Sequence, residues 1–326
     1  MAPDIASHGI GSAAAGGFDR PLLQSPRQDF LGWVFRHVGQ AVLFLIASTC
    51  ILAVLFLFVF IIKEAIPFLT SGHLGDLFAS TQWYPADGKP VFGVWAMILG
   101  SVYVTIGALV VAVPIGLLAA VFLSDIVPFR VRQVVKPIIE MLAAIPSVAY
   151  GFFAVLVLAP WMQEHLDLDT GTNALNASMI LAVMAIPTIV SISEDALTAI
   201  GRDVREGAYA LGATRVEAIA LVAIPAARSG ILAAIILGMM RAIGETMVVW
   251  MASGNASQIP TPWWDLGQSV RTMTATIAGE MGETVHGSTH YHGLFVIGLI
   301  LLAITFALNL VSESLLARSK KRTGGT

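Results

Sequence analysis

Long apolar runs separated by short polar segments follow one another along most of the chain. Six runs are long enough to cross a bilayer as helices, which takes about 20 residues; they cover residues 38–62, 91–123, 141–163, 175–193, 229–253 and 291–312. The second run is longer than one crossing needs and contains Pro114, so it predicts a tilt, a kink or a short interfacial lead-in. The pattern therefore predicts an all-α integral membrane protein with six transmembrane helices.

The composition agrees with this class of protein. Of the 326 residues, 56% are hydrophobic and only 12% are charged, and the mean hydropathy is +0.81, unlike the averages of soluble domains. The first run is too long for the core of a secretory signal, so we expect it to remain as an anchor. The net charge of −3 gives no reason to expect a nucleic-acid partner, and the single cysteine, Cys50, supports neither a disulfide nor a metal cluster.

Positive residues are distributed unevenly between the runs. Fourteen of the 18 Lys and Arg residues lie before the first run, after the second, after the fourth and after the sixth; three lie in the other segments, and Arg241 lies within a run. Cytoplasmic segments carry the excess of positive charge. We therefore predict cytoplasmic termini, with a tail at 1–37, a six-span domain at 38–316 that includes a cytoplasmic loop at 194–228, and a basic tail at 317–326.

A polar island interrupts the apolar pattern between the fourth and fifth runs. A short helical pattern opens at Glu206, Gly212 marks a turn, and a second pattern runs from Thr214 until Pro225 ends it. Charged helices of this kind cannot lie in lipid. The segment therefore predicts a helix, a turn and a helix in the cytoplasm, available to a soluble partner.

The spacing within this island resembles the EAA loop of ABC-importer permeases, the element that binds the ATPase. Glu206, Ala208, Gly212 and Pro225 occupy the positions of that motif, while Gly207 stands where the loop has alanine. Glycine loosens the first helix by about 1 kcal/mol relative to alanine. The resemblance implies that these five residues couple the chain to an ATPase.

Charge within the membrane is confined to the fifth run. Arg241 and Glu245 are four residues apart, so on one continuous helix their side chains share a face. A charge at this depth costs about 2.5–3.5 kcal/mol, which excludes a lipid-facing position. The pair either pins neighbouring helices together or lines a substrate pathway, and we favour the pathway.

Small residues recur every fourth position on the same run, at Gly230, Ala234, Gly238 and Ala242, and predict close packing of another span.

The third run contains a second candidate pathway segment. Pro146 breaks its helical pattern, while Ser147 and Tyr150 bring hydroxyl groups to membrane depth. A kink whose freed carbonyl is satisfied by neighbours explains these residues as well as a pathway contact does. Glu140, at the cytoplasmic end of this run, is explained by snorkelling or by pairing with Lys136.

The outer loops contain few candidate functional residues. Trp83 and Tyr84 are interpreted first as interface anchors and second as contacts for an external partner. Residues 268–281 predict a short helix that lies along the outer face or re-enters the membrane. Three histidines lie nearby, at His286, His290 and His292, with a spacing that is compatible with zinc binding. No thiolate completes the set of ligands, and the glycine-rich setting fits a solvated loop. We therefore predict no metal site here.

Four longer sequence segments resemble those of one particular group of these permeases. The sequences IPSVAYG, AARSGI, RAIGETM followed by SGN, and RTMTATIAGEMGE together resemble the PstC-type permease subunit of bacterial phosphate ABC importers, over roughly residues 91–309. The resemblance implies a type I ABC importer (MetI-like) permease fold in the bacterial inner membrane. It also implies three kinds of partner: a related permease subunit of PstA type, a PstB-type ATPase dimer that binds ATP and Mg, and a periplasmic PstS-type phosphate-binding protein.

No G-x-x-x-x-G-K-[ST] phosphate loop occurs in the sequence, so we expect the chain to bind no nucleotide or other cofactor and to be no enzyme itself. Two alternatives to a phosphate permease stay open. One is a permease for another oxyanion, such as sulfate or molybdate. The other is an ATPase-independent channel or ion-coupled transporter gated by Arg241 and Glu245, in which an ATPase-docking loop would have no purpose.

Overall fold

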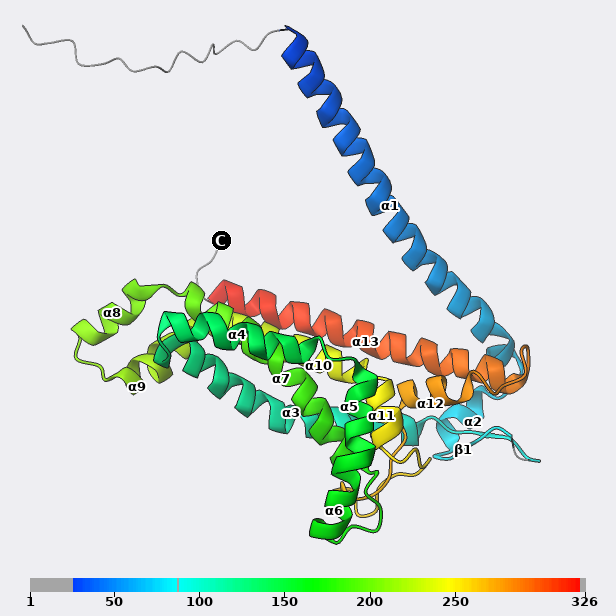
Figure 1. Ribbon diagram of the computed structural model, residues 1–326. Helices are drawn as coiled ribbons and strands as arrows, with labels where there is room; N and C mark the ends of the chain where they lie inside the picture. Colours follow the sequence, from blue (N-terminus) through cyan, green and yellow to red (C-terminus); the bar gives the residue numbers. More distant parts are fainter. Residues whose placement is uncertain (1–25, 87, 323–326) are drawn as a thin grey trace, which may run out of the picture. The chain divides into compact units, whose positions relative to one another are not determined.

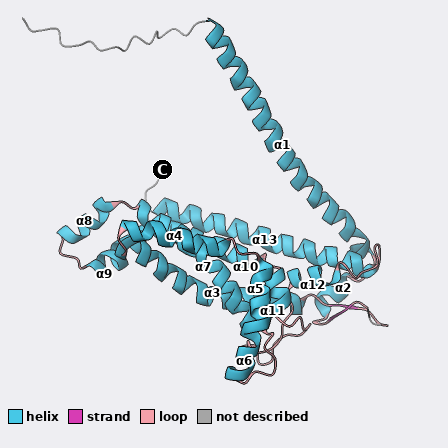
Figure 2. Cartoon of the chain, in the orientation of Figure 1, coloured by secondary structure: helices cyan, strands magenta, loops and turns pink. Residues whose placement is uncertain are grey.

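The structure, a computed structural model, describes residues 26–86 and 88–322, which are almost entirely helical (Figures 1 and 2). Along the sequence the chain divides into two units, residues 1–59 and residues 60–326. The strands β1 (Trp83–Tyr84) and β2 (Val91–Phe92) form an antiparallel pair. The helices are α1 (Pro26–Thr70), α2 (Leu74–Ala79), α3 (Trp95–Val121), α4 (Phe129–Ala143), α5 (Ser147–Phe153), α6 (Ala159–Leu166), α7 (Ala174–Ala199), α8 (Arg202–Ala210), α9 (Arg215–Glu217), α10 (Ile224–Ile243), α11 (Met247–Ala252), α12 (Met273–Glu280) and α13 (Thr289–Arg322), with turns of π-helix at Phe122–Ile126, Ala154–Leu158 and Ala218–Ala223.

The described part of the first unit is a single stretch of α1. This helix begins at Pro26, twelve residues before the predicted first span. Its apolar side chains are exposed along its length; Phe44 is 72% exposed and Leu52 is 65% exposed. A helix that is apolar on every side is more stable in lipid than in water. Residues 1–25 of the predicted N-terminal tail lie outside the described residues.

Helix α7 is the centre of the second unit and packs against α3, α4 and α10. More than half of its residues are buried, and small residues on its neighbours allow the close approach. A Cβ added at Gly116 of α3 or at Gly238 of α10 would lie 2.8 Å from the Ile189 side chain, and one at Gly230 would lie 2.3 Å from the Ala196 Cβ. The small-residue stripe predicted on the fifth run is therefore confirmed as a packing surface.

The number of spans agrees with the prediction. Five helices are long and apolar enough to cross a membrane, and the pair Phe129–Ala143 and Ser147–Leu166 makes a sixth span if counted together. That pair is bent by 83°. Pro146 lies at the bend, where it disfavours helical geometry in the residue before it. The third span is thus broken, as Pro146 predicted, but it begins well before residue 141.

The fifth span is broken as well, so the prediction of one continuous helix over residues 229–253 is wrong. Helix α10 ends at Ile243, Gly244 follows as its cap, and α11 begins at Met247. The segments that follow the two breaks pack together, because α11 contacts α5. A Cβ at Gly151 of α5 would lie 2.5 Å from the Met251 Sδ.

At one end of the second unit lie α8 and α9, and at the opposite end lie α2 and β1 (Figure 1). Trp83 in β1 is only 1% exposed, and its Nε1 donates to Glu280 at 2.8 Å, so its interpretation as an interface anchor is wrong. The predicted helix at 268–281 is present as α12; Thr272 caps it, and it packs against α3, α11 and α13.

The three histidines do not converge. His290 contacts Glu280 at 2.8 Å, His292 contacts the Glu64 carbonyl at 2.8 Å, and His286 stacks on Tyr291. Within the described ranges, no group of three potential metal-ligating side chains comes together.

Candidate functional site

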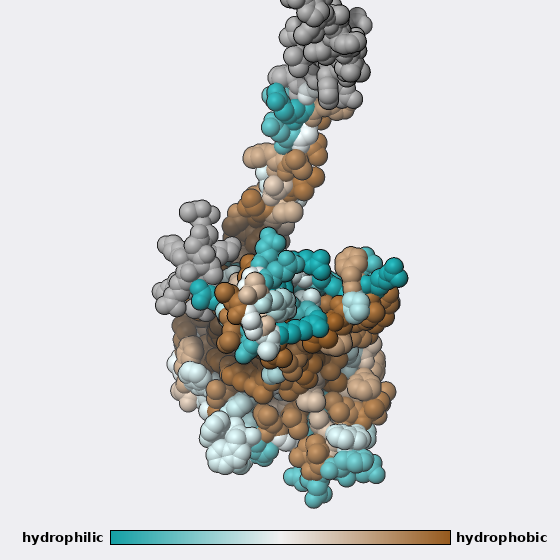
Figure 3. Space-filling model, turned by 90° about the vertical axis from the view of Figure 1, so that its left-hand side faces the viewer, coloured by the Kyte–Doolittle hydropathy of each residue, from teal (hydrophilic) through white to brown (hydrophobic). Residues whose placement is uncertain are grey.

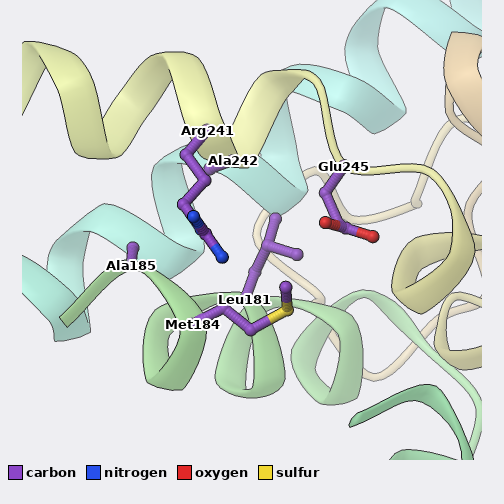
Figure 4. Close-up of a pocket in the computed structure, with 6 residues that line it drawn as sticks. All are labelled: Leu181, Met184, Ala185, Arg241, Ala242 and Glu245. Atoms are coloured by element: carbon purple, nitrogen blue, oxygen red, sulfur yellow. The ribbon is translucent and has the colours of Figure 1, made fainter. Parts of the chain in front are cut away.

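Arg241 and Glu245 line one narrow pocket of the second unit; Arg241 is exposed on this chain and Glu245 is half-buried. The other lining residues are Leu181, Met184 and Ala185 of α7 and Ala242 of α10. Both charged side chains extend toward α7, and Leu181 and Met184 rise between them (Figure 4). The walls are apolar apart from these two residues, and the exposed Arg241 guanidinium can be reached by a polar group from outside this chain.

Arg241 lies in the last turn of α10 and its Nη2 donates to the Ala143 carbonyl at 3.4 Å. Ala143 is the last residue of α4. Carbonyl groups at a helix C-terminus carry partial negative charge and favour a nearby cation by about 0.3–1 kcal/mol. The ends of α4 and α10 therefore both offset part of the cost of placing this charge in the membrane domain.

The prediction that Arg241 and Glu245 share one helix face is wrong. Among the residues the structure describes, no ion pair joins them. The cause is Gly244, which ends α10 one residue before Glu245, so the carboxylate does not follow one turn above the guanidinium. The break brings both residues to the pocket but leaves Arg241 without a carboxylate partner in this part of the chain.

Glu245 caps the segment after the break. Its Oε1 accepts from the Val248 N–H at 3.4 Å, at the start of α11, and its carbonyl accepts from the Thr274 hydroxyl at 2.9 Å. A second narrow pocket also includes Glu245, together with hydroxyl residues of α3 and the α12 region, namely Ser101, Thr105, Thr272 and Thr274. Glu245 thus lies between a pocket that contains a guanidinium and a pocket lined by hydroxyl groups.

Ser147 and Tyr150 do not line the pocket that holds Arg241 and Glu245. The Tyr150 hydroxyl donates to the Leu142 carbonyl at 2.8 Å, across the break between α4 and α5. This contact supports the interpretation of a kink whose freed carbonyl is satisfied nearby. Ser147 begins α5. A pathway role for either residue stays a prediction.

The polar loop forms the predicted helix, turn and helix. Glu206 and Gly207 are exposed on α8, Ala208 is its buried residue, and Gly212 turns the chain with a φ of +87°. Thr214 and Glu217 form a capping box that begins α9. Viewed from this end of the unit, hydrophilic residues gather over the loop (Figure 3).

Pro225 does not end a helix as predicted. It lies in the first turn of α10, directly after the turn of π-helix at Ala218–Ala223, and the second loop helix continues through both into the fifth span, over Arg215–Ile243.

Sequence reasoning missed a network of ion pairs beside this loop. The Glu194 side chain is fully buried and contacts Arg132 and Lys136, while Asp125 contacts Arg205 at 2.6 Å. Lys136 also contacts Asp195, and Glu140 accepts from Ser191, so the pairing suggested for Glu140 and Lys136 is wrong. The cationic partners were visible in the sequence only as an excess of positive charge near the span ends; nothing local indicated which carboxylates they contact.

Comparison with known proteins identifies the architecture. Residues 112–325 match the family described as binding-protein-dependent transport system inner membrane component. The chain is 39% identical over 245 residues to the probable ABC transporter permease protein YqgH of Bacillus subtilis, covering 75% of this chain and 78% of that protein. It is 35% identical over 264 residues to the phosphate transport system permease protein PstC of Mesorhizobium japonicum, covering 75% and 79%.

A chain of the inward-facing MetNI methionine ABC transporter has the same fold, with a TM-score of 0.51 and 18% identity over 70% of this chain and 94% of that one. The six-span architecture with a MetI-like permease fold is therefore confirmed. The chain is a multi-pass protein of the inner membrane and a membrane subunit rather than a catalytic enzyme. It belongs to the family of binding-protein-dependent transport system inner membrane components, the permeases of ABC importers.

Proposed function

We propose that this chain is the permease subunit of an ATP-driven importer of inorganic phosphate, in which it forms half of the translocation pathway. The relative named as a phosphate transport system permease supports the substrate. The observation that carries the proposal is Arg241, a guanidinium of the membrane domain that is exposed on this chain beside an apolar pocket and has no carboxylate partner among the described residues. An anion crossing the membrane needs a donor of this kind.

Arg241 would bind the anion directly. Phosphate loses hydration in an apolar pathway, and a guanidinium offers a planar fork that matches two phosphate oxygens. Because the guanidinium contacts the Ala143 carbonyl rather than a carboxylate, an anion can approach it without first breaking an ion pair. The partial charges of two helix ends hold Arg241 in place while leaving most of its donors available.

Glu245 would limit how long the anion stays. Passage requires binding weak enough to allow release, and a carboxylate in the same pocket repels a bound anion. In another state of the pathway Glu245 could pair with Arg241 and displace the anion toward the cytoplasm. The break at Gly244 gives Glu245 a short segment outside regular helix in which such a movement needs little rearrangement.

The loop from Glu206 to Pro225 would bind the ATPase on the cytoplasmic side, with both termini on that side as the charge distribution predicts. Glu206, Gly207 and Gly212 would form the contact, through exposed α8 and the turn after it, while the buried Ala208 would hold α8 in place against the loop. The partners would be a related permease subunit of PstA type, a PstB-type ATPase dimer that binds ATP and Mg and hydrolyses the ATP, and a periplasmic PstS-type phosphate-binding protein. This chain would bind no cofactor.

Phosphate uptake by variants of the assembled complex tests the proposal. Arg241→Gln should lower uptake by roughly tenfold or more, as expected for the loss of charged hydrogen bonds, with assembly intact. Arg241→Lys, which keeps the charge but loses the fork, should retain part of the uptake, and Glu245→Gln should slow turnover without reducing assembly.

Three results would contradict this proposal. Full uptake with Gln at position 241 would exclude a pathway role, and loss of assembled complex in proportion to loss of uptake would show that Arg241 only holds helices together. Sulfate or molybdate that competes fully with phosphate in the wild-type complex would point to another oxyanion as the substrate.

A further inference from the structure

We propose that Asp125 is a positioning residue that joins the loop helices α8 and α9 to the end of α3, so that a displacement of α8 by the ATPase reaches the membrane spans. This inference rests on the proposed function, since it assigns the internal contact through which the coupling loop acts. Neither the sequence motif of the loop nor the pathway pocket includes Asp125.

The Asp125 carboxylate receives three hydrogen bonds from two side chains. Its Oδ1 accepts from Arg205 Nε at 2.6 Å, and its Oδ2 accepts from Arg205 Nη2 at 3.3 Å and from the Ser124 hydroxyl at 2.5 Å. A guanidinium that donates two of its N–H groups to one carboxylate makes a strong and geometrically specific contact. The Asp125 side chain is only 5% exposed, so solvent screens this contact little.

The same contact reaches both helices of the loop. Arg205 belongs to α8 and also donates to the Leu197 carbonyl of α7 and to the Gly201 carbonyl between α7 and α8. Arg215, the first residue of α9, donates to the Asp125 carbonyl. Arg205 and Arg215 stand on either side of the Gly212 turn, so Asp125 is held from both ends of the coupling loop.

Apolar packing connects α8 to α3 indirectly, through Ala223 of the π-helical turn, which is buried in one cluster with Ala120 of α3. Ala208 is the buried residue of α8, and this helix packs chiefly against residues 218–223 of the loop itself. The loop and the end of α3 also face an open cavity of about 740 Å³, whose lining includes Asp125, Arg205 and Arg215 themselves. The charged contacts to Asp125 therefore join α8 and α9 directly to the end of α3, beside the indirect apolar route.

The position of Asp125 on α3 suits this role. It lies in the turn of π-helix at Phe122–Ile126 that ends the span. Such turns interrupt regular helical hydrogen bonding and occur often at functional positions. Since α3 also packs along α7 and contacts α10, which carries Arg241, a shift imposed at Asp125 acts on the helices that form the pathway pocket.

The test compares Asp125→Asn with Asp195→Asn in the complete transporter, reconstituted with its binding protein in liposomes. Asp195 is the matched control because it also forms an ion pair, but with Lys136 of α4 rather than with a loop helix, and is 63% exposed. The measured quantity is phosphate transported per ATP hydrolysed, on complexes purified through the ATPase, so that lower abundance of a variant does not enter the ratio.

We expect Asp125→Asn to lower this ratio by roughly tenfold, the change expected when a buried carboxylate loses its charged hydrogen bonds, while ATP hydrolysis and complex assembly persist. Asp195→Asn should leave the ratio unchanged. Arg205→Gln should reproduce the defect, and the double variant should be no worse than either single variant, because the two residues act through one contact.

An unchanged ratio in both Asp125→Asn and Arg205→Gln would overturn the proposal, as would a double variant whose defect is the product of the two single defects. A failure of the proposed function is distinguishable, because the wild-type complex would then transport no phosphate at all.

Discussion

The close packing of α10 on α7 gives a quantitative prediction for Gly230→Ala. A Cβ at position 230 would lie 2.3 Å from the Ala196 Cβ, whereas carbon atoms in contact are about 3.5–4.0 Å apart. Neither methyl group can rotate away, so α10 must shift by more than about 1 Å. Overpacking of this kind costs typically 1–3 kcal/mol, and alanine recovers about 1 kcal/mol of helix propensity. We expect a net loss of about 1 kcal/mol in the free energy of unfolding.

Equilibrium unfolding in mixed micelles measures this loss. Gly207→Ala is the matched control, because a Cβ there meets nothing within 4 Å, so the substitution should not destabilise the chain. Ala196→Gly combined with Gly230→Ala removes the clash, and the pair should be more stable than the sum of the single effects implies. If Gly230→Ala unfolds with the same free energy as the wild-type chain, the helix packing described above is incorrect.

Two further predictions concern the loop and the topology. Gly212→Val places a β-branched residue at a φ of +87°, which costs at least about 1–2 kcal/mol, so it should lower ATPase binding and phosphate uptake with the spans intact. Gly212→Asn, which tolerates this conformation, should retain both, and normal uptake and binding in the valine variant would exclude a role for the turn. A tag placed after Thr326 should be protected from protease added to intact spheroplasts, and its cleavage without lysis would reverse the predicted orientation.

The sequence predicted the features that local patterns determine. Apolar runs of sufficient length identified the spans, and glycine with flanking helical patterns located the turn at Gly212, where the positive φ requires a residue of this kind. The capping partners Thr214 and Glu217 are three residues apart, so a local sequence pattern is sufficient to predict their contact. The small residues at Gly230 and Gly238 likewise indicated the face on which α10 packs.

The break at Gly244 was missed because a single glycine inside an apolar run does not by itself end a helix. Glycine costs a helix only about 1 kcal/mol, less than tertiary packing contributes. Here α11 packs on α5 and the Thr274 hydroxyl binds the Glu245 carbonyl. Contacts between residues far apart in sequence therefore decide where α10 ends, and no local pattern encodes them.

The missed break changes the physical interpretation of Arg241. On a continuous helix, Glu245 would neutralise the guanidinium, and an anion would have to compete with a carboxylate fixed one turn away. With α10 ending at Ile243, the charge is balanced instead by carbonyl groups at the ends of α4 and α10, which attract a cation weakly and cannot leave the site. An anion that binds Arg241 thus adds to these contacts rather than replacing them. Under the proposed function Glu245, which accepts from the Val248 N–H at 3.4 Å, would act as a separate charge whose distance from Arg241 changes as the spans move.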